Sequence, residues 1–106
     1  MLTLLMRVLN KKLLDTAKRK YSDSRKAIDG WMLTIQNIHP KNYFELKKTF
    51  SSADLVGENE ILICFDIKGN HYRLIAKMDY PDTAIVKDFI KHSDYDRKYR
   101  YKGRKK

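Results

Sequence analysis

The spacing of the apolar residues changes near Gly57, and this change restricts the folds that the chain can adopt. Before Gly57, apolar side chains recur three and four residues apart, first over residues 11–21 and then over residues 27–38. This period is typical of amphipathic helices. Asn10 is a suitable N-cap for the first helix, and Pro40 ends the second.

After Gly57 the residues favour strands. Three β-rich segments are separated by turn signals at 68–70 and 79–82, and they comprise residues 61–67, 71–78 and 83–90. A short extended segment at 7–9 precedes the first helix, and residues 43–50 predict a further short helix. The order is therefore β-α-α-β-β-β. We expect an α+β domain in which the N-terminal strand and two helices pack on an antiparallel sheet, with the helices on one face.

The middle predicted strand, residues 71–78, has two different faces, because successive side chains of a strand point to opposite sides. One face is apolar and suited to pack under the helices: Tyr72, Leu74, Ala76 and Met78. The other face carries His71, Arg73, Ile75 and Lys77. We therefore expect Arg73 and Lys77 on an uncovered, cationic sheet face that could hold a single strand of RNA.

The basic residues are concentrated at the C-terminus. Residues 97–106 include seven basic side chains and no acidic one, whereas residues 1–96 hold 16 basic against 13 acidic residues. We interpret 1–96 as one domain and 97–106 as a basic arm that binds a polyanion, with Tyr99 and Tyr101 placed to stack on bases. The alternative is a solvated terminus, which is the commoner fate of a charge run.

Several classes of protein do not fit this composition. The single cysteine, Cys64, excludes a disulfide framework and favours a reducing compartment, so we expect a cytoplasmic protein. No segment approaches the roughly 18 apolar residues of a membrane helix, and we expect no membrane partner. The three histidines are far apart, and the chain has no phosphate-binding glycine loop and no nucleophile motif. We expect no metal or other cofactor. Whether the natural chain starts at Met1 or Met6 stays open.

Metal-free cleavage of RNA is compatible with this sequence. RNA supplies its own nucleophile, the 2′-hydroxyl, so the protein needs only a proton acceptor, a proton donor and a cation at the phosphate. His92 and Tyr95 follow the third strand and can transfer protons or stack on a base, and Arg73 supplies the cation. The structural alternative is a histidine bonded to the backbone at the strand end and a tyrosine packed at the edge of the domain.

Three segments resemble, in order and spacing, the HigB-type toxins of the RelE/ParE superfamily. They are FDIKGNHYRLI at 65–75, IVK at 85–87 and HSDYD at 92–96, beside the family patterns F-N-I-x-G-N-x-Y-R-L-I, V-x-I-[KR] and T-H-x-E-Y-D. Asp66, Lys91 and Asp94 depart from the asparagine, threonine and glutamate that are usual there. Asp88 is acidic where the family strand is often apolar.

This resemblance implies an mRNA endonuclease that cuts on the translating ribosome. Its partner would be a HigA-type helix-turn-helix antitoxin. The toxin would contact DNA only indirectly, through this antitoxin. Arg73 would stabilise the phosphate in the transition state, and His92 and Tyr95 would orient RNA and share the acid–base work. Six basic side chains would hold the RNA backbone: Lys68, Lys77, Lys87, Lys91, Lys98 and Arg100. Two other functions stay open: a ParE-like toxin that binds DNA gyrase without chemistry, and an RNA- or ribosome-binding module without cleavage activity.

Overall fold

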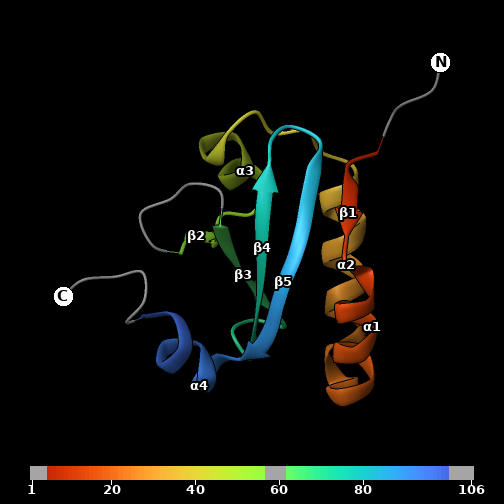
Figure 1. Cartoon of the computed structure of the whole chain (residues 1–106), viewed down its shortest axis with the longest axis vertical. Coiled ribbons are helices and arrows are strands. Elements are labelled where there is room, and N and C mark those ends of the chain that lie inside the picture. The colour runs from red at the N-terminus through yellow and green to blue at the C-terminus, as the bar shows by residue number, and fades with distance from the viewer. Residues whose placement is uncertain (1–4, 57–61, 101–106) are drawn as a thin grey trace.

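The computed structural model describes residues 5–56 and 62–100 (Figure 1). The helical half of the chain comprises β1 (Arg7–Leu9), α1 (Lys11–Lys20), the 3-10 turn η1 (Ser22–Ser24), α2 (Arg25–Gln36) and α3 (Tyr43–Thr49). The second half comprises β2 (Asp54–Leu55), β3 (Leu62–Ile67), β4 (Tyr72–Asp79), β5 (Thr83–Lys91), α4 (His92–Tyr95) and the π-helical turn η2 (Asp96–Arg100). The predicted α+β class and the order of its main elements are confirmed. Among the described residues, no helix combines the length and the apolar character needed to cross a membrane.

The sheet is mixed, which corrects the expectation of an antiparallel sheet. Its five strands lie in the order β1-β5-β4-β3-β2. The pairs from β2 to β5 are antiparallel, whereas β1 runs parallel to β5. Short turns force β3, β4 and β5 to alternate in direction, but β1 is connected through helices and is free of that constraint.

The helices cover one face of the sheet, where the main core lies. The apolar face of β4 is buried there as predicted, with Tyr72, Leu74, Ala76 and Met78. Leu14 and Ala17 of α1 and Ile28, Trp31 and Ile35 of α2 pack in the same cluster, at the helical spacing seen in the sequence.

A bulge interrupts the β4–β5 ladder. Ala76 pairs with Val86 while its neighbour Ile75 pairs with Asp88, so β5 contributes one extra residue, Lys87. The extra residue shifts the in-and-out alternation of the β5 side chains by one position. As a result, Phe89 joins the main core, and Asp88 shares the opposite face with Ile75.

Asn10 has a different role from the one predicted. It occupies the N-cap position of α1, but its backbone is left-handed, with φ 68°, and its side chain makes no capping hydrogen bond. Asparagine tolerates this conformation better than most residues. The amide Nδ2 instead donates to the carbonyl oxygen of Val86 at 2.8 Å, which attaches the start of α1 to β5.

The face of the sheet opposite the helices, here called the open face, is partly covered, which corrects a second expectation. Val56, Cys64 and Ile75 are buried there, and Tyr95 and Tyr99 pack against them from α4 and η2, together called the C-terminal segment. Figure 1 shows α4 at the end of β5, away from α1 and α2. The apolar side chains on this face explain the cover, because their burial removes nonpolar surface from water.

Candidate active site

Arg73 lies in β4 on the open face, opposite Asp66 of β3. Its Nη1 is 3.1 Å from Asp66 Oδ1, and the same nitrogen donates to the carbonyl oxygens of Asn70 at 3.2 Å and Tyr72 at 3.4 Å. The Arg73 side chain is only 12% exposed. The neighbouring acceptors therefore fix its orientation, and these contacts use one nitrogen of a group that carries five N–H donors.

Tyr95 brings an aromatic ring to this guanidinium. The Cζ atom of Arg73 lies 5.8 Å from the ring centroid of Tyr95, within the range of a cation–π contact. The Tyr95 ring also stacks on Tyr99, with centroids 5.5 Å apart and planes inclined by 24°. A side-chain hydrogen bond joins Tyr95 to Cys64 below it.

Burial raises the pKa of the Cys64 thiol to about 12, although the positive charge of Arg73 and the bond from Tyr95 act in the opposite direction. The thiol is therefore neutral at physiological pH. A neutral, buried thiol is a poor nucleophile, and Cys64 serves this site by packing.

His92 lies where β5 ends and α4 begins. Its backbone N–H donates to the carbonyl oxygen of His71 at 2.9 Å, which extends the β4–β5 ladder by one bond, and its side chain is exposed. The described contacts bring Arg73 and Tyr95 together. The backbone of His92 lies beside the start of β4, but its imidazole is not part of the contact between Arg73 and Tyr95.

The predicted RNA-binding lysines do not form one group. Lys77 shares the open face with Arg73, and Lys87 is the exposed bulge residue. Lys91 pairs with Tyr72 and therefore faces the helix side, and Lys68 forms an ion pair of 2.9 Å with Asp23 of η1. Lys98 forms an ion pair of 2.7 Å with Asp88 of β5. Residues 97–100 belong to η2, and the side chain of Arg100 and residues 101–106 lie outside the described residues.

Asp88 is a contact residue of this face whose role sequence analysis missed. Its Oδ2 accepts hydrogen bonds from the Tyr99 hydroxyl and from Lys98 Nζ, both at 2.7 Å. Its Oδ1 accepts from the backbone N–H of Phe89 at 2.9 Å. The available signals were the acid in an apolar strand and the four-residue spacing of Tyr95 and Tyr99, which places both rings on one side of a helical turn.

The protonation of these groups follows from their contacts. Partial burial acts to raise the pKa of Asp88, but the hydrogen bonds from Lys98 and Tyr99 outweigh it and hold that pKa below its ordinary value. Burial and the bond to Asp88 raise the pKa of Tyr99. At neutral pH the carboxyl is ionised and the phenol is neutral, so each is in the form that this hydrogen bond requires.

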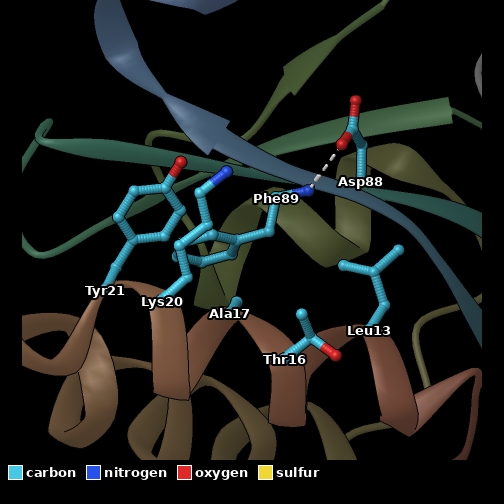
Figure 2. Close-up of a pocket in the computed structure, with 7 residues that line it drawn as sticks. All are labelled: Leu13, Thr16, Ala17, Lys20, Tyr21, Asp88 and Phe89. Carbon is cyan, nitrogen blue, oxygen red and sulfur yellow. Dashed lines mark hydrogen bonds between the residues drawn. The ribbon is translucent and has the colours of Figure 1, made fainter.

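A separate groove of about 270 Å³ lies on the helix side of β5, against α1 (Figure 2). Figure 2 shows Lys20 and Tyr21 near Phe89, while the Asp88 carboxyl points away from the α1 side chains. This groove is distinct from the surface around Arg73. Over residues 5–56 and 62–100, no three His, Cys, Asp or Glu side chains are grouped as ligands of a metal ion.

A known protein family matches most of the chain. The HigB_toxin family, described as the RelE-like toxic component of a toxin–antitoxin system, matches residues 24–98. No curated protein matches the chain with significant similarity. The family match includes α2, α3, every strand from β2 to β5, and α4, and so contains Arg73, His92 and Tyr95. The chain therefore belongs to the HigB family of RelE-like toxins, the toxic components of toxin–antitoxin systems, and an antitoxin is its implied partner.

Proposed function

We propose that this toxin is an endoribonuclease that cuts mRNA on the ribosome, in the cytoplasm, and that a HigA-type helix-turn-helix antitoxin inhibits it. The observation that carries the proposal is the contact between Arg73 and Tyr95 on the open face. A cation and an aromatic ring held together suit a phosphate and its adjoining base. The exposed side chain of His92, at the end of the neighbouring strand, supplies an imidazole that can accept or donate a proton.

The reaction needs no cofactor. The 2′-hydroxyl loses its proton to a base and attacks the adjacent phosphorus, a 2′-O–P bond forms, and the P–O5′ bond breaks. A proton donor neutralises the leaving 5′-oxygen, which leaves a 2′,3′-cyclic phosphate and a 5′-hydroxyl. Arg73 stabilises the charge that develops on the phosphoryl oxygens, and His92 and Tyr95 share the two proton transfers.

The exposed lysines would hold RNA on more than one side of the toxin. Lys77 lies on the face that carries Arg73, and with Lys87 and Lys98 it would contact the messenger backbone near the cut. Lys68 and Lys91 lie toward the helix side, so we assign them to a different stretch of RNA, ribosomal rather than messenger. Arg100 and the rest of the basic arm would add contacts to the RNA backbone.

Controlled expression, followed by mapping of mRNA 5′ ends with and without active translation, tests this function. Wild-type toxin should produce new 5′ ends only on translated messages. Arg73→Ala should lose about 100- to 1,000-fold in cleavage, as when one group that stabilises the transition state is removed. His92→Ala should lose about 100- to 10,000-fold.

Arg19→Ala is the matched control, because it removes an exposed arginine of α1 on the helix side of the molecule. It should cleave like wild type. Undiminished cleavage by both Arg73→Ala and His92→Ala, in folded protein, contradicts the site. DNA damage signalling with intact mRNA favours a gyrase-binding toxin instead, and salt-sensitive RNA binding without growth arrest favours a binding module.

A further inference from the structure

We propose that Asp88 is a positioning residue of this site: it anchors η2 to β5 through Tyr99 and Lys98, and thereby holds Tyr95 beside Arg73. This inference rests on the proposed function. Asp88 itself lies away from the guanidinium in the ladder, because Asp88 is opposite Ile75 and Arg73 is opposite Ile90. It acts through the tyrosines.

The contacts of Asp88 are those of an anchor. The carboxylate is 18% exposed and accepts from three donors: Phe89 N–H, Tyr99 Oη and Lys98 Nζ. Hydrogen bonds to an ionised acceptor are stronger than neutral ones. The Phe89 contact orients the carboxylate from within its own strand, so the other oxygen faces η2 in a fixed direction.

The tyrosine pair spans three strands. Cys64, Ile75 and Asp88 are neighbours in register across β3, β4 and β5, and so form one row on the open face. Tyr99 is bonded to Asp88 at one end of this row, and Tyr95 is bonded to Cys64 at the other. The two rings stack on each other, and Arg73 contacts the Tyr95 ring. Displacement of Tyr99 would therefore remove the ring on which Tyr95 stacks.

The helices of the C-terminal segment are too short to keep it in place by themselves. Its two helical elements contain four and five residues, too few for a helix that is stable on its own. The apolar cluster beneath it, built on Val56, Cys64 and Ile75, is small beside the main core. Directional hydrogen bonds to a partly buried carboxylate can then decide where the rings lie.

Cys64 provides a reporter that is independent of RNA cleavage. It is the only cysteine of the chain, its side chain is 2% exposed, and it lies under the tyrosine pair. A thiol reagent can therefore reach it when the C-terminal segment moves away or when the protein unfolds. The fluorescence of Trp31, which is buried in the main core, distinguishes these two events.

The test compares four full-length proteins: wild type, Asp88→Ala, Asp88→Asn and Tyr99→Phe. Asp88→Ala removes the acceptor, and we expect Cys64 to react with Ellman's reagent about 10- to 100-fold faster, because a hydrogen bond to a charged group is lost. Asp88→Asn keeps an uncharged acceptor and should fall between Asp88→Ala and wild type. Tyr99→Phe keeps the carboxylate and should also react faster, so the test survives if Asp88→Ala does not fold.

The control is Asp29→Asn. Asp29 forms an ion pair with Lys18 between α1 and α2, so this change also breaks an Asp–Lys pair but does so on the helix side. It should leave both the thiol reaction and RNA cleavage as in wild type. The Trp31 emission should be the same in every variant, which shows that faster labelling reports local displacement.

Cleavage kinetics on a translated message complete the test. If Asp88 has a positioning role, kcat should be lowest in Asp88→Ala, intermediate in Asp88→Asn and highest in wild type. KM should change less, because RNA still binds but Tyr95 is misplaced. Unchanged labelling in both Asp88→Ala and Tyr99→Phe overturns the inference, as does faster labelling with unchanged kcat. A wild-type protein that does not cut RNA overturns the proposed function instead, and the labelling rates still show whether Asp88 anchors the segment.

Discussion

The molecule contains two clusters of the same three residue types, one near the helices and one on the open face. In the first, Asp23 of η1 accepts from the Tyr72 hydroxyl at 2.6 Å and from Lys68 Nζ at 2.9 Å. In the second, Asp88 of β5 accepts from a tyrosine and a lysine of η2, both at 2.7 Å. Each cluster joins a short helical turn to the sheet.

The clusters differ in which partner the sheet provides. Tyr72 belongs to β4, and its ring is already fixed in the main core by Phe89, with centroids 5.4 Å apart, and by Tyr21, at 4.9 Å. Its aspartate is an exposed side chain, 51% accessible. In the second cluster the aspartate is the fixed partner, and the tyrosine lies on a terminal turn. The same chemistry therefore supplements packing in one place and directs it in the other.

The largest expected effect comes from truncating β4 on each face. Leu74 and Ile75 are both fully buried, but Leu74 faces the main core and Ile75 faces the C-terminal segment. Leu74→Ala should lower the free energy of unfolding by about 3–5 kcal/mol, and Ile75→Ala by about 2 kcal/mol, because the terminal turn can settle into the gap. Urea denaturation measures both values. An equal or greater loss for Ile75→Ala would show that the two faces are packed alike.

Removing each tyrosine hydroxyl tests the comparison more directly. Tyr99→Phe should make Cys64 about tenfold more reactive while the melting temperature changes little. Tyr72→Phe should do the reverse: it should lower the melting temperature and leave the reactivity of Cys64 unchanged, because the Tyr72 ring stays packed on the opposite face. Thiol kinetics and thermal melts on the same samples give both readings. Faster labelling in Tyr72→Phe would mean that the clusters are not independent.

Alkaline pH should weaken the first cluster. The pKa of Tyr72 is raised to about 12, most of all by its hydrogen bond to Asp23 and next by burial. The same Asp23 carboxylate is also paired with the charged side chain of Lys68. A tyrosine whose pKa is raised by folding stabilises the fold fully below its ordinary pKa of 10, and this contribution disappears as the pH rises toward 12. The difference in unfolding free energy between wild type and Tyr72→Phe should therefore shrink between pH 10 and 12. A difference that is constant over this range would contradict the role of the Asp23 contact.

The smallest effects should come from the two lysines. Lys98 is 53% exposed, so Lys98→Met should cost only about 0–1 kcal/mol, as exposed ion pairs do. Lys68→Met should change stability less still, because its aspartate is solvent-accessible. Chemical denaturation is the measurement for both variants. If Lys98→Met accelerates Cys64 labelling as much as Tyr99→Phe, the lysine rather than the phenol holds η2 in place.

Much of the fold could be predicted from local patterns. The turn signals at 68–70 and 79–82 gave the three consecutive strands, and alternation gave the buried face of β4. The parallel pairing of β1 could not be derived, because it depends on how the helices return the chain to the sheet. The cover on the open face was missed because residues 97–100 were assigned to a basic arm by their charge, whereas Tyr99 belongs to a turn that contacts β5.

The site was less accessible to sequence reasoning than the fold. Arg73 and Tyr95 were singled out, and the structure brings them into contact, but their roles and that of His92 stay predictions. The sequence marked Asp88 as an unusual acid in its strand, but it did not indicate which residues contact the carboxylate. Its partners lie 10 and 11 residues ahead in a π-helical turn, a conformation that no apolar period announces.

The bulge at Lys87 has a consequence for insertions and deletions in β5. In a regular ladder without a bulge, the present sequence would place Phe89 on the open face and direct the Asp88 carboxylate into the apolar interior, because strand side chains alternate. The inward and outward side chains before Lys87 and those after it therefore follow alternations that differ by one residue, and the bulge lets the apolar side chains of both halves face the main core. Deleting Lys87 alone would keep both halves in phase with β4, whereas inserting one more residue beside it would reverse the second half.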